Sequence, residues 1–173
     1  MCIGLMAIAA DFCPWYYGED FTGIEMLFYI GSIMIVSLGW SGLFGSMVLV
    51  PAGKQKYYTL GVTVGAVINL ILNICLIPRY ASNGAMIASV VAEVVGMLIM
   101  YYYVRKEFNT IGLLKKCIPY AIASGIMGAI VVALGAILQA NWITTIVEIG
   151  LGAAIYLSVL ILLGDSIMGE FYQ

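Results

Sequence analysis

Three polar side chains lie in the middle of long apolar runs of this 173-residue chain. Asn69 and Asn73 are four residues apart, so a helix carries both on one face, and Glu93 lies in the following apolar run. Amides and carboxylates are costly in hydrocarbon, and they usually face protein or a water-filled pathway. Two interpretations stay open for each of the three residues: hydrogen bonding between helices, or lining of a transport pathway.

Small residues accompany these polar groups at similar spacing. They are Gly61, Gly65, Ala85, Ser89 and Gly96. A G-x-x-x-G pattern is typical of a seam where two membrane helices pack closely. Counting residues from the helix ends places Asn69 and Glu93 each roughly 12–14 Å below the outer boundary of a bilayer. A contact between Asn69 and Glu93 is compatible with this spacing, provided that the two small-residue faces meet.

Charged residues elsewhere in the apolar part of the chain give weaker signals. Arg79 is a lone cation in a short turn between two apolar runs, where it is a weak candidate for contact with a substrate phosphate. Asp11 and Glu148 lie nearer to the ends of their apolar runs. We expect these two acids at the membrane interface or in contact with water.

Motifs for bond chemistry are absent from the sequence. We find no nucleophile elbow, no zinc motif, no dinucleotide fingerprint and no positioned nucleophile–base pair. The chain has no histidine, and its four cysteines are scattered without metal-ligand spacing. The sequence therefore predicts no catalytic residue, no metal site and no cofactor, and we expect a protein that is not an enzyme.

The composition indicates a membrane protein built only of helices. Hydrophobic residues make up 64% of the chain and charged residues only 9%, which leaves too little polar surface for a water-soluble fold. Alternating segments typical of a membrane barrel are missing. We predict an all-α, polytopic membrane bundle of about six transmembrane helices, the first of them truncated. The predicted spans are about 1–17, 23–50, 57–77, 84–104, 117–138 and 143–163.

The distribution of lysine and arginine predicts the orientation in the membrane. Arg79 is the one cation on one side, and the loops on the other side hold the remaining six: Lys54, Lys56, Arg105, Lys106, Lys115 and Lys116. This asymmetry predicts that both termini are cytoplasmic and that the turn at 78–83 is outside. Residues 1–17 are interpreted as the distal end of a membrane helix, broken by Asp11 and Pro14; a signal peptide is the alternative. There is no basic patch for nucleic acid.

Four ordered segments resemble one protein family. They are LVPAGKQKYY at 49–58, GAVINLILN at 65–73, LIPRY at 76–80 and the run from Gly84-Ala85 to Glu93. Together they are similar to the C-terminal part of polysaccharide-biosynthesis flippases, the oligosaccharide repeat-unit transporters of the multidrug/oligosaccharidyl-lipid/polysaccharide exporter superfamily. The resemblance is dense over residues 44–105. One departure is Tyr80-Ala81, where the family usually has Tyr-Gly.

The resemblance implies a two-lobed transporter of the cytoplasmic membrane. Such a protein moves undecaprenyl-diphosphate-linked oligosaccharide to the outer leaflet by alternating access. Residues 1–173 would then form a single C-terminal lobe, with a missing N-terminal lobe in the same or a separate chain as its partner, and Asn69, Asn73 and Glu93 as candidates for the substrate pathway. The alternatives are a cation-coupled multidrug exporter of the same superfamily, and a non-transporting membrane scaffold or gene fragment.

Overall fold

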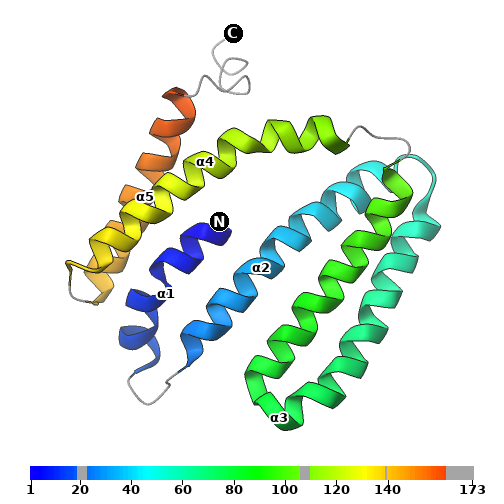
Figure 1. Cartoon of the computed structure of the whole chain (residues 1–173), viewed down its shortest axis with the longest axis horizontal. Coiled ribbons are helices and arrows are strands. Elements are labelled where there is room, and N and C mark those ends of the chain that lie inside the picture. The colour runs from blue at the N-terminus through cyan, green and yellow to red at the C-terminus, as the bar shows by residue number, and fades with distance from the viewer. Residues whose placement is uncertain (19–22, 106–109, 139, 163–173) are drawn as a thin grey trace. The chain divides into compact units, whose positions relative to one another are not determined.

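The computed structural model describes residues 1–18, 23–105, 110–138 and 140–162. Every regular element in this part of the chain is a helix, which confirms the all-α prediction (Figure 1). The elements are α1 (Cys2–Tyr17), α2 (Ile24–Gly42), a π-helix η1 (Leu43–Leu49), α3 (Gln55–Val104), α4 (Thr110–Gly135) and α5 (Trp142–Leu162). Four stretches are long and apolar enough to cross a membrane: Ile24–Leu49, Gln55–Val104, Lys116–Gly135 and Trp142–Leu162. The chain is therefore a multi-pass membrane protein by length and composition.

The chain divides into two compact units. One contains α1, α4 and α5 (residues 3–25 and 111–173), and the other contains α2, η1 and α3 (residues 26–110). The prediction that residues 1–173 form one lobe stays a prediction. Lys106, one of the predicted cytoplasmic cations, and residue 163 at the end of the last predicted span lie outside the described residues.

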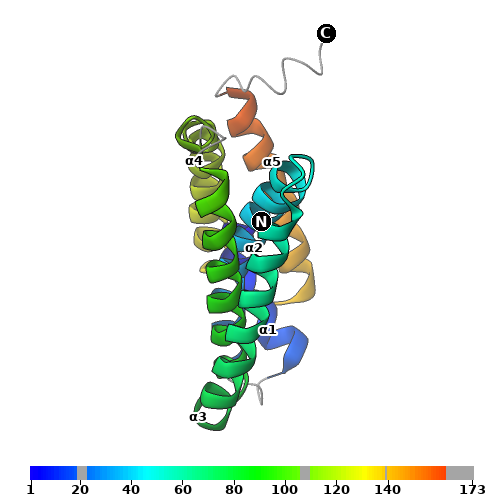
Figure 2. The same cartoon turned by 90° about the vertical axis from the view of Figure 1, so that its right-hand side faces the viewer.

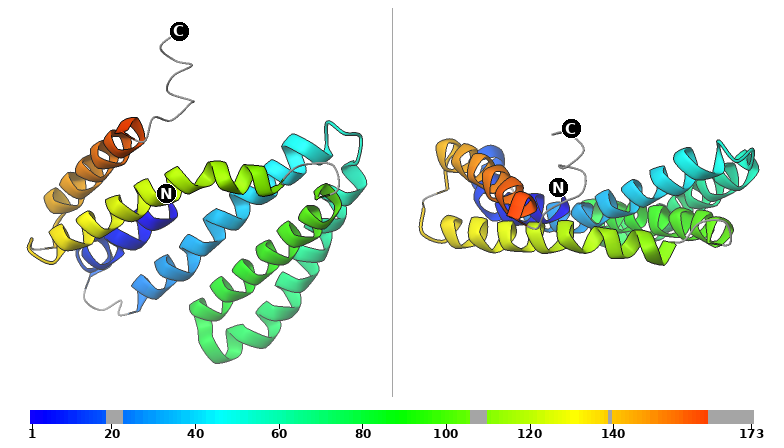
Figure 3. Two further views of the ribbon diagram at one scale, coloured as in Figure 1. Left: turned by 45° about the horizontal axis from the view of Figure 1, so that its top comes forward. Right: turned by 90° about the horizontal axis from the view of Figure 1, so that it is seen from above.

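Helix α3 is a hairpin of two antiparallel arms. Its 50 residues would form a straight helix of about 75 Å, far longer than a bilayer core of about 30 Å. The chain reverses at Ala81, whose φ of 46° and ψ of −125° are not helical. Figures 1 and 3 show the two arms side by side, and Figure 2 shows the turn at their shared end. The reversal falls within the predicted turn at 78–83, but the first arm continues beyond the predicted end of its span at residue 77, because Pro78 lies within the helix.

Glycines bring the two arms of α3 into close contact. A Cβ added to Gly61 would lie 3.0 Å from the carbonyl oxygen of Gly96, and one added to Gly65 would lie 3.1 Å from that of Ala92. Real Cβ contacts are rarely this short, so a larger residue at either glycine would push the arms apart. The predicted small-residue packing seam is confirmed.

The end of the second predicted span is a π-helix. Phe44 and Leu49 of η1 form a buried cluster with Met100 and Val104 from the end of α3. Gly45 is buried under the ring of Tyr58, which occupies the place where a Cβ would be. Single-turn π-segments inside α-helices often mark functional sites. Here η1 follows directly on the part of α2 that faces the hairpin.

The unit of α1, α4 and α5 contains two departures from expectation. Helix α1 continues through Asp11 and Pro14, which were expected to break it. Glu148 is fully buried, so the expectation that it meets water is wrong. Trp15 of α1 donates from Nε1 to Oγ1 of Thr145 of α5 at 2.9 Å, which ties these helices together.

Candidate functional site

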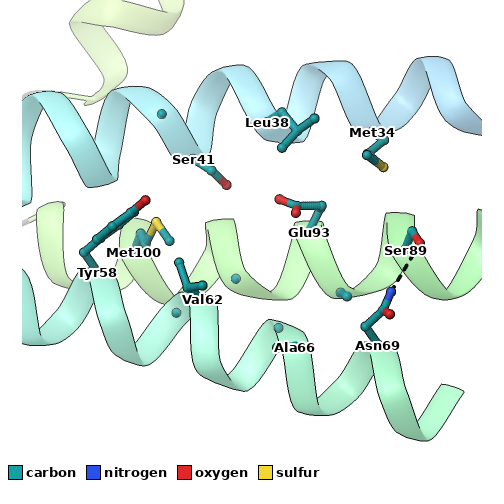
Figure 4. A pocket seen from close by; sticks show the side chains of 15 residues that line it. Met34, Leu38, Ser41, Tyr58, Val62, Ala66, Asn69, Ser89, Glu93 and Met100 are labelled. Carbon is teal, nitrogen blue, oxygen red and sulfur yellow. Dashed lines mark hydrogen bonds between the residues drawn. The ribbon is translucent and has the colours of Figure 1, made fainter. Parts of the chain in front are cut away.

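A cavity of about 550 Å³ lies within the unit of residues 26–110. It is lined by residues of α2 and of both arms of α3 (Figure 4). Methionine, leucine and valine side chains from α2 and from both arms of α3 line it together with small residues. The polar side chains that line it are Ser41, Tyr58, Asn69, Ser89 and Glu93.

Asn69 and Glu93 line the same cavity from opposite arms of α3. The sequence reasoning anticipated that the two residues would lie at one level, because the arms are antiparallel and joined by a short turn. Their side chains have different neighbours, however. Asn69 donates from Nδ2 to Oγ of Ser89 at 3.2 Å. The carboxylate of Glu93 points instead toward α2, in the region of Leu38 and Ser41 (Figure 4).

Asn73 contributes to the site indirectly. It does not line the cavity, but its Nδ2 donates to Oδ1 of Asn69 at 2.8 Å. A chain of amide and hydroxyl groups therefore runs from Asn73 through Asn69 to Ser89. With its oxygen held by Asn73 and its nitrogen held by Ser89, the Asn69 amide has a defined orientation.

Ser41 is a polar group of the cavity that sequence reasoning missed. Its Oγ is buried, and it has no hydrogen-bond partner among the described residues. An unsatisfied buried hydroxyl costs free energy, and a ligand that fills the cavity would supply the missing partner. The available signal was the four-residue spacing of Ser37 and Ser41 in a glycine-rich stretch, which places both on one face of α2.

Arg79 lies apart from the cavity. It is exposed near the reversal of α3 and is not among the lining residues. Three of the four candidate residues are thus brought together by hydrogen bonds or by the cavity, and Arg79 is not. Its contact with a substrate phosphate stays a prediction.

The arrangement suits binding rather than bond chemistry. Glu93 is the one charged residue that lines the cavity, so the site has a carboxylate, an amide and hydroxyls among apolar side chains. Such groups form hydrogen bonds with sugar hydroxyls or attract a lipophilic cation. Among the described residues, no group of three or more histidine, cysteine or acidic side chains is placed to hold a metal ion.

Comparison with known proteins gives a partial similarity to a membrane flippase. The chain is 22% identical over 134 residues to the lipid II flippase MurJ of Bacillus subtilis (strain 168). The aligned region covers 73% of this chain but only 24% of that protein, so the chain spans about a quarter of this relative's length. No family model and no solved structure matches the chain. The similarity supports the exporter superfamily that the sequence segments resemble, and it supports no finer family within it.

Proposed function

We propose that this chain is part of a membrane transporter that flips undecaprenyl-diphosphate-linked oligosaccharide to the outer leaflet by alternating access. The observation that carries the proposal is the cavity between α2 and the α3 hairpin, which presents Glu93 and Asn69 within helices of membrane-spanning length. A relative named as a lipid II flippase supports a lipid-linked substrate in general. The oligosaccharide and its carrier belong to the proposal.

In this proposal the residues bind and release a polar head group without breaking bonds. On the α2 side of the cavity, Glu93 accepts hydrogen bonds from sugar hydroxyls, and Ser41 both donates to them and accepts from them. Asn69 does the same on the opposite arm, held in place by Asn73 and Ser89. Arg79, outside the cavity, meets the diphosphate near the membrane surface. A companion N-terminal lobe, in the same or a separate chain, completes the pathway in the cytoplasmic membrane.

Substitution of Glu93 at the native locus tests this function. Glu93→Ala should lower export of lipid-linked oligosaccharide about tenfold or more, as expected when a charged hydrogen-bonding group is lost. Protein levels in the membrane should stay near normal. The matched control is Glu25→Gln, in the first turn of α2 and outside the cavity, which should leave export unchanged. Unchanged export in Glu93→Ala, or a loss of protein that accounts for the whole defect, would contradict the proposal.

A second candidate function is a cation-coupled multidrug exporter. It is favoured by the combination of one carboxylate with Met34, Leu38 and Met100 in the same cavity, which suits an apolar cation. Growth on toxic lipophilic cations separates the two functions: a drug exporter confers resistance that Glu93→Ala removes. If neither export nor resistance depends on the chain, a non-transporting scaffold or gene fragment is the remaining interpretation.

A further inference from the structure

Two acidic side chains meet in the unit of α1, α4 and α5. Asp11 of α1 and Glu148 of α5 both lie against Gly135 at the end of α4. A Cβ added to Gly135 would overlap the Asp11 carboxylate and would lie 3.1 Å from Oε1 of Glu148. The absence of a side chain at Gly135 thus creates the space in which the two carboxyl groups face each other.

The Glu148 carboxyl group lacks an ordinary hydrogen-bond donor. The residue is 0% exposed, and neither of its oxygens accepts a hydrogen bond from a donor group among the described residues. The carboxyl group of Asp11 faces it across the space left at Gly135. Ionised carboxylates only accept hydrogen bonds, so a bond between two carboxyl groups exists only when one of them carries a proton.

Among the described side chains of α1, α4 and α5, no basic group compensates for the two acids. In α5, Glu148 is the one charged residue between 142 and 162, and α4 has none between 117 and 135. Lys116 is exposed toward the other end of α4. Helix α1 adds the buried thiol of Cys13 and no cation. Two ionised carboxylates that face each other in apolar surroundings would strongly repel each other.

The surroundings fit a proton better than a metal ion. Oxygen-binding metal ions such as Ca²⁺ and Mg²⁺ take about six or more ligands. The hydroxyl of nearby Thr145 is already engaged, because it accepts from Trp15 and donates to the carbonyl of Asn141 at 3.2 Å. Two carboxyl groups that share one proton need no further ligand.

We propose that Asp11 and Glu148 form a buried proton-binding site, and that the bound proton fastens α1 to α5. With the proton bound, the pair carries one negative charge, and the protonated carboxyl group donates to the other. When the proton leaves, the pair carries two negative charges, and their repulsion loosens the packing of α1 against α5 around the Trp15–Thr145 hydrogen bond. The site lies in a different unit from the cavity and does not depend on the proposed transport function.

Infrared spectroscopy of the chain in lipid nanodiscs tests proton binding. The wild-type chain should show a carboxylic-acid carbonyl band that shifts in D₂O and that Glu148→Gln removes. Glu25→Gln, an acid outside the pair, should keep the band. A chain without a protonated carboxyl band, or one whose band survives in Glu148→Gln, would overturn the proposal. Spectral changes that require Na⁺ would assign the pair to a metal cation instead.

Isotope labelling and hydrogen exchange cover the case in which Glu148→Gln fails to insert. In the wild-type chain the infrared band should shift with ¹³C-labelled glutamate or aspartate, and a band that shifts with neither contradicts the site.

The contact between α1 and α5 is tested by amide hydrogen exchange in these two helices. As the pH is raised, amide exchange in these two helices should increase severalfold more than the intrinsic chemical exchange rate does. Asp11→Asn should abolish this additional increase. Exchange that follows only the intrinsic rate would show that the proton does not fasten the helices.

Discussion

At the scale of single residues, the Asn69 amide serves both packing and the cavity. Its nitrogen and oxygen are held by Ser89 and Asn73, while the side chain still lines the open space. The two interpretations that the sequence left open, interhelical hydrogen bonding and lining of a pathway, are thus compatible in this residue. Glu93 differs, because its carboxylate points away from this chain of amides toward α2.

Removal of the Ser89 hydroxyl should weaken the hairpin slightly. Ser89→Ala leaves the Asn69 amide without its acceptor in the other arm, which should cost about 0.5–1.5 kcal/mol of unfolding free energy. Reversible unfolding in mixed micelles measures the change. The control is Ser46→Ala at an exposed position of η1, which should change stability by less than about 0.5 kcal/mol. Equal effects of the two substitutions would contradict the role of this hydrogen bond.

At the scale of elements, the α3 hairpin depends on one strained residue and a glycine seam. Ala81 has a φ of 46°, in a region that favours glycine. This chain therefore has a side chain where the backbone conformation disfavours one. Gly84 follows it on the second arm, where a Cβ would touch the backbone of Leu76. The turn is therefore tight on both sides.

Glycine at the reversal should stabilise the protein. Ala81→Gly relieves the conformational strain, and we expect a gain of about 1 kcal/mol in unfolding free energy. Ala66→Gly provides the control, because Ala66 is exposed on a regular helical turn of the first arm, where glycine should cost about 1 kcal/mol. Thermal unfolding in detergent micelles compares the two. A loss of stability in Ala81→Gly would show that the turn conformation is wrong.

Widening the seam should separate the two arms. Gly65→Val places a side chain against the Ala92 carbonyl and should cost about 1–3 kcal/mol. It should also remove the hydrogen bond between Asn69 and Ser89, so the effects of Gly65→Val and Ser89→Ala should be less than additive. Gly39→Ala is the matched control, because a Cβ at Gly39 has no atom within 4 Å. Additive effects in the double variant would indicate that the seam does not position Asn69.

The sequence alone predicted the helices and the seam, because both depend on local periodicity. Apolar length marks a span, and glycine at steps of four marks a close-packed face. It did not predict that Ser41 of α2 shares the cavity with Glu93, or that Asp11 meets Glu148. Both pairs depend on which helices pack together, and no spacing along the chain encodes that choice. The predicted turn at 78–83 contains the reversal at Ala81, but the first arm extends past its predicted end at residue 77 because the helix continues through Pro78.

At the scale of the whole molecule, charge predicts how the chain lies in the membrane. Six of its seven cations fall on one side when the spans alternate, and Arg79 falls on the other. The helices of the described residues are compatible with this alternation, since the two arms of α3 return the chain to the side on which it started. Proposed substrate release to the outer leaflet requires this orientation, because the diphosphate contact at Arg79 must lie outside.

Cysteine labelling on intact cells should confirm the orientation. In a chain whose four native cysteines are replaced, Ser82→Cys beside the turn of α3 should react with a membrane-impermeant maleimide added from outside. Gln55→Cys, exposed at the start of α3, should react only after the membrane is opened. The physical reason is that Lys54, Lys56 and Arg105 hold their end of the hairpin in the cytoplasm. The reverse labelling pattern would place Arg79 in the cytoplasm and remove the outward diphosphate contact from the proposed mechanism, while leaving the cavity between α2 and α3 intact.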